Sequence, residues 1–294
     1  MVLGLAGAGV NYAAVQAPLE EDPPLRLVLN VPANRIYVYE HGERTKSYRV
    51  SVGQRRFATP AGSYTLSTAT WNPWWHPPKS EWARAEKPEP PGWDNPMGRV
   101  KLNFTELYYV HGTPKINEDA LGIPASHGCV RMANRDVIEL AQLVHRYATP
   151  DLASSEVQEL VDNPQDTRTI RFRNEIPFAV VYDVAIVRND FLIIYPDVYA
   201  RLGDKAAMID QVQEVLANHG VDPSEINRGH LDRLVEKGMK MRVAMSLEEL
   251  TTMRTATVGS DTERDTQNRV AYGSDPDRRG QPGSAADPRS SAER

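Results

Sequence analysis

The chain has 294 residues, of which 40% are hydrophobic and 25% are charged, and its formal net charge is -5 at pH 7. This length accommodates one or two globular domains. The acidic balance provides no basic face of the kind that binds nucleic acid, so we expect no nucleic-acid partner. A single cysteine, Cys129, excludes an internal disulfide framework and a cysteine-rich zinc site, and we expect no cofactor.

No apolar run reaches the roughly 18 residues that a membrane helix requires, so we predict no transmembrane segment. Residues 3–17 come closest, but polar residues interrupt them. The first basic residue of the chain is Arg26, so the charged start of a secretory signal is missing. We therefore expect residues 1–24 to be a flexible leader or a truncated export signal.

From residue 25 the sequence alternates apolar and polar residues, which is typical of strands with one buried face. Pro32, Ala33 and Asn34 separate the first two alternating runs and predict a hairpin between them. A further turn is predicted at residues 59–62. The predicted strands cover residues 25–31, 35–39, 45–53 and 63–70.

Residues 71–97 contain all five tryptophans and many prolines. Proline is disfavoured inside helices and central strands, so we predict a long loop, and long ordered loops are often functional. The tryptophans have two interpretations, as packing residues or as a lid over a substrate groove. The candidates for groove lining are Trp71, Trp74 and Trp75, together with Tyr109.

Strand character returns at residues 99–104 and 107–111, and Asn134 then has the properties of a helix N-cap. Apolar residues follow Asn134 at helical spacing. They are Val137, Ile138, Leu140, Ala141 and Val144. We place the end of the first domain, residues 25–150, just after this predicted helix.

Residues 151–200 are expected to form a linker helix and added β-strands. A helix is predicted from Lys205 to Asn218, because Gly220 is a good helix breaker, and residues 201–253 are expected to form a small helical subdomain. Residues 254–294 have few large apolar side chains and balanced charge, so we predict a disordered tail. The predicted strands after residue 150 cover residues 169–173, 178–188, 191–195 and 240–245.

The candidate catalytic residues lie between positions 110 and 131. His111 ends an apolar strand, and Ser126-His127-Gly128-Cys129 follows further along the chain. An imidazole can take the proton of a thiol and leave a nucleophilic thiolate. Attack on a carbonyl creates an oxyanion, which the backbone N–H groups of Gly128 and Cys129 are candidates to hold.

Other interpretations of these residues stay open. A lone cysteine is often a small buried hydrophobe, and a histidine at a strand end is often a hydrogen-bonded structural group. A zinc site of His111, His127 and Cys129 would have the three protein ligands of a catalytic zinc. No carboxylate lies beside them in the sequence, and we predict no metal.

The pair of motifs formed by His111 and Ser126-His127-Gly128-Cys129 resembles the signature of the L,D-transpeptidase family of the YkuD type. The resemblance extends over residues 25–148. A looser resemblance, over residues 176–199, is to a β appendage that follows the catalytic motif in some larger members. The other matching segments are Ser51-Val52-Gly53, Thr59-Pro60-Ala61-Gly62, Trp71-Asn72-Pro73-Trp74, Pro77-Pro78, Asn95-Pro96-Met97-Gly98 and His111-Gly112-Thr113.

This resemblance implies a mainly β catalytic domain, a β-sandwich or barrel with one flanking helix, followed by an α+β C-terminal extension. It implies that Cys129 is the nucleophile and His111 the general acid and base, oriented by the carbonyl of Gly112. By the same match, Ser126, His127 and Gly128 shape the pocket and the oxyanion site.

The family resemblance also implies a reaction. Such enzymes attack the L,D-peptide bond of a peptidoglycan tetrapeptide stem, release D-alanine, and transfer the acyl group from a thioester to an amine acceptor. The implied partners are stem peptides and either a second stem or a protein to be anchored, and the implied location is the cell envelope or periplasm. The alternatives are a carboxypeptidase or peptide hydrolase that uses the same Cys–His pair, and an inactive wall-binding protein.

One position departs from the commonest family pattern. Family members often carry asparagine two residues after the cysteine, and this chain carries Arg131. Its guanidinium can grip a substrate carboxylate in a bidentate manner. It can equally form a salt bridge to an acidic residue of the following helix.

Overall fold

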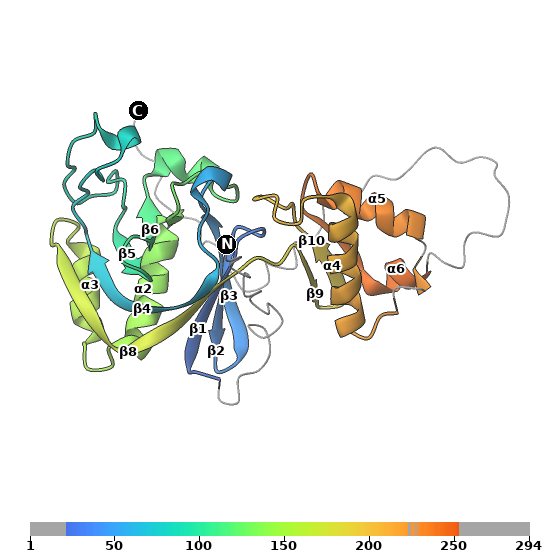
Figure 1. The fold of residues 1–294 in the computed structure, drawn as a ribbon. Helices are drawn as coiled ribbons and strands as arrows, with labels where there is room; N and C mark the ends of the chain where they lie inside the picture. The colour runs from blue at the N-terminus through green and yellow to red at the C-terminus, as the bar shows by residue number, and fades with distance from the viewer. Residues whose placement is uncertain (1–21, 223–224, 227, 253–294) are drawn as a thin grey trace, which may run out of the picture. The chain divides into compact units, whose positions relative to one another are not determined.

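The computed structural model describes residues 22–222, 225–226 and 228–252 (Figure 1). The predicted tail and all but the last three residues of the predicted leader lie outside the described residues. Within the part that is described, no helix is both long enough and apolar enough to cross a membrane.

The first part of the chain is a closed β-barrel with the strand order β1-β2-β3-β7-β6-β5-β4-β8. Two α-helices, α2 (Asn134–Ala148) and α3 (Ser154–Asp162), follow β7 in the sequence. A mainly β domain with a flanking helix is therefore confirmed. The strands are β1 (Leu25–Asn30), β2 (Arg35–Glu40), β3 (Glu43–Ser51), β4 (Gly62–Trp71), β5 (Val100–Asn103), β6 (Tyr109–Thr113), β7 (Val130–Ala133) and β8 (Arg168–Val181). Short 3-10 helices lie in the connections at η1 (Arg55–Phe57), η2 (Glu81–Ala83) and η3 (Lys115–Ala120).

Strand β8 closes the barrel, although the sequence places it among added strands. It runs antiparallel to β4 and parallel to β1, and Figure 1 draws it as the long yellow strand. It joins the strand expected at residues 169–173 to the first four residues of the strand expected at 178–188, with Pro177 opposite Thr65. The end of the second expected strand is instead a separate strand, β9 (Ala185–Arg188). The barrel therefore extends to residue 181, beyond the expected domain end at residue 150. Its two partners lie far away in the sequence, which local periodicity cannot reveal.

The barrel core forms because alternate residues of each strand face inward. In the central strands these are Leu102, Val110 and Val130, which are fully buried. Helix α2 packs against β5, β6, β7 and β8 with its apolar stripe, and each large apolar side chain buried this way contributes roughly 1.5–3 kcal/mol. The buried apolar residues of the stripe are Val137, Ile138, Leu140, Ala141, Leu143, Val144 and Ala148.

The prediction that Asn134 is the N-cap of this helix is wrong. Asn134 is the first helical residue, and Ala133 before it provides no side-chain cap. The Asn134 side chain faces the long loop, where its Oδ1 accepts the Arg99 N–H at 2.8 Å and its Nδ2 donates to the Trp93 carbonyl at 3.0 Å. The asparagine therefore ties the start of the helix to the loop that precedes β5.

Residues 72–99 form the predicted long loop, which buried asparagine amides hold in place. Asn72 donates to three carbonyls at and after the end of α3. Asn95 does the same within the loop, through the carbonyls of Pro73, Glu89 and Pro90. These amides satisfy backbone groups that have no strand or helix partner.

Residues 185–252 form a second arrangement, a three-stranded antiparallel sheet in the order β11-β10-β9 with three helices. Helix α4 has the predicted ends, and Asp204 caps it by accepting the Ala207 N–H at 3.0 Å. The segment expected to be a small helical subdomain therefore shares a sheet with two preceding strands. The elements are β9 (Ala185–Arg188), β10 (Phe191–Ile194), α4 (Lys205–Asn218), α5 (Arg228–Gly238), β11 (Val243–Ser246) and α6 (Leu247–Thr252).

Candidate functional site

Three neighbouring strands carry basic side chains in one row. Lys101 of β5 is opposite His111 of β6, and His111 is opposite Arg131 of β7. Directly opposed residues of paired strands lie on the same face of a sheet, and the next residue along each strand lies on the other face. Leu102 and Val110 occupy that other face and are fully buried in the core. The row therefore lies on the face turned away from the core.

Cys129 lies at the end of this row, directly before β7, and is half-buried. Its thiol donates to the Leu107 carbonyl at 3.8 Å, and the Tyr109 N–H is placed to donate to the sulfur. Tyr109 precedes His111 by two residues, as Cys129 precedes Arg131. The candidate base therefore lies on β6, and the candidate nucleophile lies directly before the adjacent parallel strand β7, with a two-residue offset in register.

His111 is buried, with 4% of its surface exposed. Its Nδ1 lies 2.6 Å from the Gly112 carbonyl. A carbonyl only accepts, so Nδ1 carries the proton and Nε2 keeps its lone pair in the neutral ring. Burial, Arg131 and Lys101 lower the pKa of His111 to about 4, although the carbonyls of Gly112 and Met97 favour the protonated ring. At pH 7 the imidazole is neutral and can accept a proton.

The thiol of Cys129 is also uncharged at rest. Burial raises its pKa, and the Tyr109 N–H and the charges of Arg131 and Lys101 partly offset this effect. The structure therefore holds a neutral thiol and a neutral imidazole rather than a preformed ion pair. Proton transfer between them has to accompany attack on a substrate.

The turn that carries the cysteine is organised by Ser126. Its hydroxyl accepts the Gly128 N–H at 3.1 Å and donates to the Cys129 carbonyl. Gly128 has a φ of +114°, and a Cβ there would lie 2.4 Å from the Tyr108 ring, so only glycine fits. The Gly128 N–H, expected to hold an oxyanion, is already engaged by Ser126. The Cys129 N–H is therefore the candidate donor at this turn.

Two other residues of the motif have packing contacts. The ring of His127 lies against Phe57 of η1, with 4.7 Å between ring centroids, and burial and nearby arginines lower its pKa. A Cβ on Gly112 would lie 2.2 Å from Oδ1 of Asn134. Gly112 is thus required both for this close packing and for the carbonyl that orients His111.

The aromatic residues predicted to line a groove have different environments. Trp71 is fully buried, and its indole N–H donates to Nε2 of His145 at 2.9 Å, so its prediction as groove lining is wrong. Trp71 ends β4, and its side chain points into the core. Trp75 is also buried, with 9% exposed, whereas Trp74 is 50% exposed. Tyr109 lies beside the thiol, with Nζ of Lys101 4.9 Å from its ring centroid.

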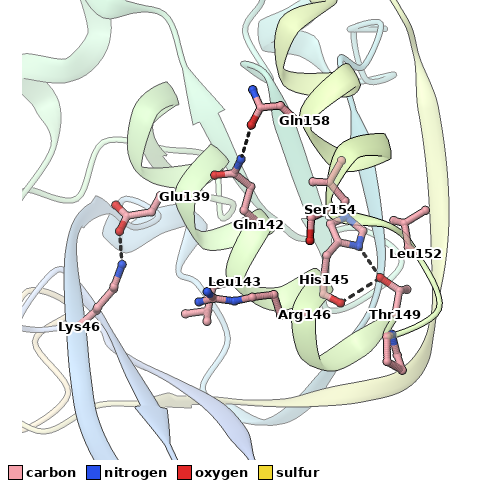
Figure 2. Close-up of a pocket in the computed structure, with 12 residues that line it drawn as sticks. Lys46, Glu139, Gln142, Leu143, His145, Arg146, Thr149, Leu152, Ser154 and Gln158 are labelled. Carbon is pink, nitrogen blue, oxygen red and sulfur yellow. Dashed lines mark hydrogen bonds and ion pairs between the residues drawn. The ribbon is translucent and has the colours of Figure 1, made fainter.

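A cavity of about 480 Å³ lies between β3, α2 and the start of α3 (Figure 2). In its wall, Nδ1 of His145 lies 2.8 Å from the Thr149 hydroxyl, which donates to the His145 carbonyl at 3.1 Å. Because Trp71 donates to the other ring nitrogen, both nitrogens of His145 are used within the protein. Cys129 and His111 do not line this cavity, which is separate from the candidate site.

Lys101, Met97 and Thr59 also belong to the surroundings of the site, and sequence reasoning missed them. Lys101 alternates with apolar residues in its strand, which is a signal for an exposed face but not for a site. Thr59 and Met97 were named within segments that resemble the family, Thr59 also as a turn residue, but neither was predicted as a site residue. In residues 22–252, apart from the gaps in the described part, no group of three or more His, Cys, Asp or Glu side chains is placed to hold a metal ion.

Residues 24–169 match the family model YkuD, described as the L,D-transpeptidase catalytic domain. Several relatives carry L,D-transpeptidase in their names. YkuD of Bacillus licheniformis is 28% identical over 140 residues, which are 47% of this chain and 70% of that protein. YbiS of Escherichia coli K12 is 33% identical over 120 residues, which are 38% of this chain and 39% of that protein. The match thus spans about two fifths of the length of the E. coli relative.

Solved structures of L,D-transpeptidases are also similar to this chain. L,D-transpeptidase 3 from Mycobacterium tuberculosis aligns with a TM-score of 0.36 and 15% identity, over 54% of this chain and 62% of that chain. The catalytic domain of the L,D-transpeptidase from E. faecium aligns with a TM-score of 0.35 and 12% identity, over 55% of this chain and 98% of that chain.

Proposed function

Residues 24–169 belong to the YkuD family of L,D-transpeptidase catalytic domains, and from this we propose that the protein is a cysteine-dependent L,D-transpeptidase of the cell envelope. It acts on tetrapeptide stems of peptidoglycan, releases D-alanine and passes the acyl group to an amine acceptor. The observation that carries this proposal is geometric: His111, with Nδ1 held by the Gly112 carbonyl, lies on the strand next to the turn of Cys129, the single cysteine of the chain.

In the first half-reaction the Cys129 thiol gives its proton to Nε2 of His111, and the sulfur forms a bond to the carbonyl carbon of the L,D-peptide bond. The carbonyl electron pair moves to oxygen, where the Cys129 N–H stabilises it. When the carbonyl re-forms, the C–N bond breaks and the nitrogen of D-alanine takes the proton from His111. The products are a thioester on Cys129 and free D-alanine.

In the second half-reaction an acceptor amine attacks the thioester carbonyl and gives a proton to His111. The C–S bond breaks, and the sulfur of Cys129 regains its proton from the imidazole. One amide bond has then been exchanged for another, so the balance needs only the donor stem and the acceptor amine. The acceptor is a second stem in 3→3 crosslinking or a protein amine in wall anchoring.

The two cations near the thiol, Lys101 and Arg131, are placed to attract an anionic substrate. Burial lowers the pKa of both Lys101 and Arg131, and no carboxylate of the described residues pairs with either. A partly buried cation without a carboxylate partner is costly, and a carboxylate of the stem peptide would offset that cost. This favours substrate binding over a salt bridge to α2 as the role of Arg131.

The proposal is tested with Cys129→Ala and His111→Ala on defined tetrapeptide stems, with D-alanine release as the measurement. We expect Cys129→Ala to abolish release and His111→Ala to lower its rate by about hundredfold or more. The matched control is His219→Ala, an exposed histidine at the end of α4, which should keep the wild-type rate. Unchanged release in both site variants would refute the proposal.

A hydrolase that uses the same acyl-enzyme is the second candidate. The partial exposure of Cys129 favours it, because such a thioester is accessible to water as well as to an amine. Product analysis with and without an acceptor amine separates the two. A new amide product that depends on the amine identifies a transpeptidase, and free acid in both reactions identifies a hydrolase.

A further inference from the structure

The turn that carries the nucleophile is connected by hydrogen bonds, through Thr59, to Tyr199, a residue far along the chain. Gly53 and Thr59 bracket the turn that contains η1, and Tyr199 lies in the segment after β10. The Tyr199 hydroxyl donates to the Gly53 carbonyl at 2.9 Å and accepts the Thr59 N–H at 3.1 Å. Tyr199 is 6% exposed. One buried hydroxyl thus joins the two ends of this turn.

Thr59 connects this turn to the nucleophile turn. Its hydroxyl donates to the Gly128 carbonyl at 2.8 Å and accepts the Gly53 N–H at 2.9 Å. The two backbones are also packed closely, because a Cβ on Gly53 would lie 3.0 Å from the Gly128 Cα. The position of Gly128 therefore depends on where Thr59 is held.

The hydrogen bond from Thr59 also sets the direction of the Cys129 N–H. The Gly128 carbonyl and the Cys129 N–H belong to one planar trans peptide unit, in which the two groups point in opposite directions. Fixing the carbonyl on Thr59 fixes the N–H on the opposite side. This N–H is the candidate oxyanion donor, since Ser126 already engages the Gly128 N–H.

Tyr199 is itself held by a satisfied buried network. Its N–H donates to the Tyr182 hydroxyl at 2.6 Å, and that hydroxyl donates to Asp197 at 2.5 Å. The Asp197 carboxylate also accepts the N–H groups of Arg201 and Leu202, at 2.9 and 2.8 Å. The rings of Tyr182 and Tyr199 stack with 5.5 Å between centroids. A polar network whose members are all paired is rigid.

We propose that Tyr199 is a positioning residue for acyl transfer, which acts through Thr59 to aim the Cys129 N–H at the oxyanion. This inference rests on the proposed function, in which Cys129 attacks a carbonyl. It gives the segment after the barrel a role in the reaction. This segment contains neither His111 nor any residue of Ser126-His127-Gly128-Cys129.

The test compares two reactions of the same sulfur. With p-nitrophenyl acetate, Cys129 attacks the carbonyl through an oxyanion and releases nitrophenolate, leaving an acetyl thioester. With iodoacetamide, the sulfur displaces iodide and no oxyanion forms. Cys129 is the single cysteine, so both reactions report one site, and Cys129→Ala supplies the background rate.

Tyr199→Phe and Thr59→Val remove the two hydroxyl groups, and Thr59→Ser keeps one of them. Tyr48→Phe is the matched control, because Tyr48 is 4% exposed and its hydroxyl has no hydrogen-bond partner within the part of the chain that the structure describes. We expect the first two variants to lower the acetylation rate about tenfold, with the alkylation rate and its pH profile unchanged. Thr59→Ser and Tyr48→Phe should keep both rates.

Two results would overturn the inference. An equal loss in both reactions would mean that the thiol itself has moved, and unchanged acetylation in Tyr199→Phe and Thr59→Val would mean that the hydroxyl groups have no role. The probe reaction requires no stem peptide. Acetylation with the expected pattern but without D-alanine release from stems would therefore refute the proposed function alone.

Discussion

Two buried histidines of the barrel domain share their burial and their pKa but not their surroundings. His111 is 4% exposed and His145 is 3% exposed, and burial is the main cause that lowers the pKa of each to about 4. His145 accepts a hydrogen bond from Trp71 at Nε2, so protonation there would break a bond. His111 instead faces carbonyls of Gly112 and Met97, which favour its protonated form.

This difference indicates which histidine can take part in proton transfer. A depressed pKa marks a buried imidazole, and burial alone has no catalytic meaning. What distinguishes His111 is a ring nitrogen that can gain a proton without losing a hydrogen bond, next to the strand end that carries Cys129. His145 has both nitrogens engaged, and its bond to Trp71 joins α2 to the end of β4.

The largest expected effect comes from replacing each of the two histidines in turn and comparing the rates of the two variants. His111→Gln should lower the rate of D-alanine release by about 10²–10⁴-fold, because the general acid and base is lost. His145→Gln should keep the rate per folded molecule. A similar loss of rate in both variants, measured on folded protein, would contradict the distinction.

The next effect concerns stability. Trp71→Phe removes the donor to Nε2 of His145 and leaves a buried acceptor without a partner and a smaller side chain in the core. We expect the free energy of unfolding to fall by about 3–4 kcal/mol, measured by denaturant titration. A value below about 1 kcal/mol would mean that the bond between Trp71 and His145 has little weight.

The lowered pKa values of His111 and His145 also predict how stability depends on pH. Between pH 6.5 and about 4 the unfolded chain binds protons that the folded histidines exclude, so stability falls as the pH falls through this window. Each histidine can account for up to about 3 kcal/mol by pH 4, after which its effect levels off. His145→Gln should show a smaller loss than the wild type in unfolding measurements across this range, and an identical loss would exclude His145 as a source.

The smallest expected effect comes from removing the charge of Lys101 beside His111 and Cys129. Lys101 lowers the pKa of both His111 and Cys129 by its charge. Lys101→Met should therefore move the acid limb of the pH–rate profile of iodoacetamide alkylation to higher pH and slow alkylation at neutral pH. Lys101→Arg, which keeps the charge, is the matched control. A profile that does not move in Lys101→Met would show that this charge does not reach the pair.

Much of the local structure could be predicted from the sequence. Alternation located the first hairpin and the strand that ends near His111, and helix α4 runs from Lys205 to Asn218 as predicted. The long loop was predicted at residues 71–97, close to the observed 72–99, because proline is excluded from regular elements. These features depend on neighbours within a few residues, which the sequence displays directly.

Other predictions from the sequence were wrong. Asn134 has the right residue type for a cap, yet its side chain bonds the loop that precedes β5. Trp71 belongs to an aromatic segment, yet it faces the core because it ends β4. In both cases a partner distant in the sequence decided the outcome, and a single-residue preference is weaker than that partner.

The sequence by itself determined the strand periodicity, the single thiol at Cys129 and the motif spacing that resembles the family. Only the tertiary structure decided that β8 closes the barrel, that Lys101, His111 and Arg131 form one row, and that the Tyr199 hydroxyl bonds both Gly53 and Thr59. The physical reason is that periodicity and motifs are encoded between near neighbours. Strand register and buried hydrogen bonds join residues whose separation in the chain carries no signal of their proximity in space.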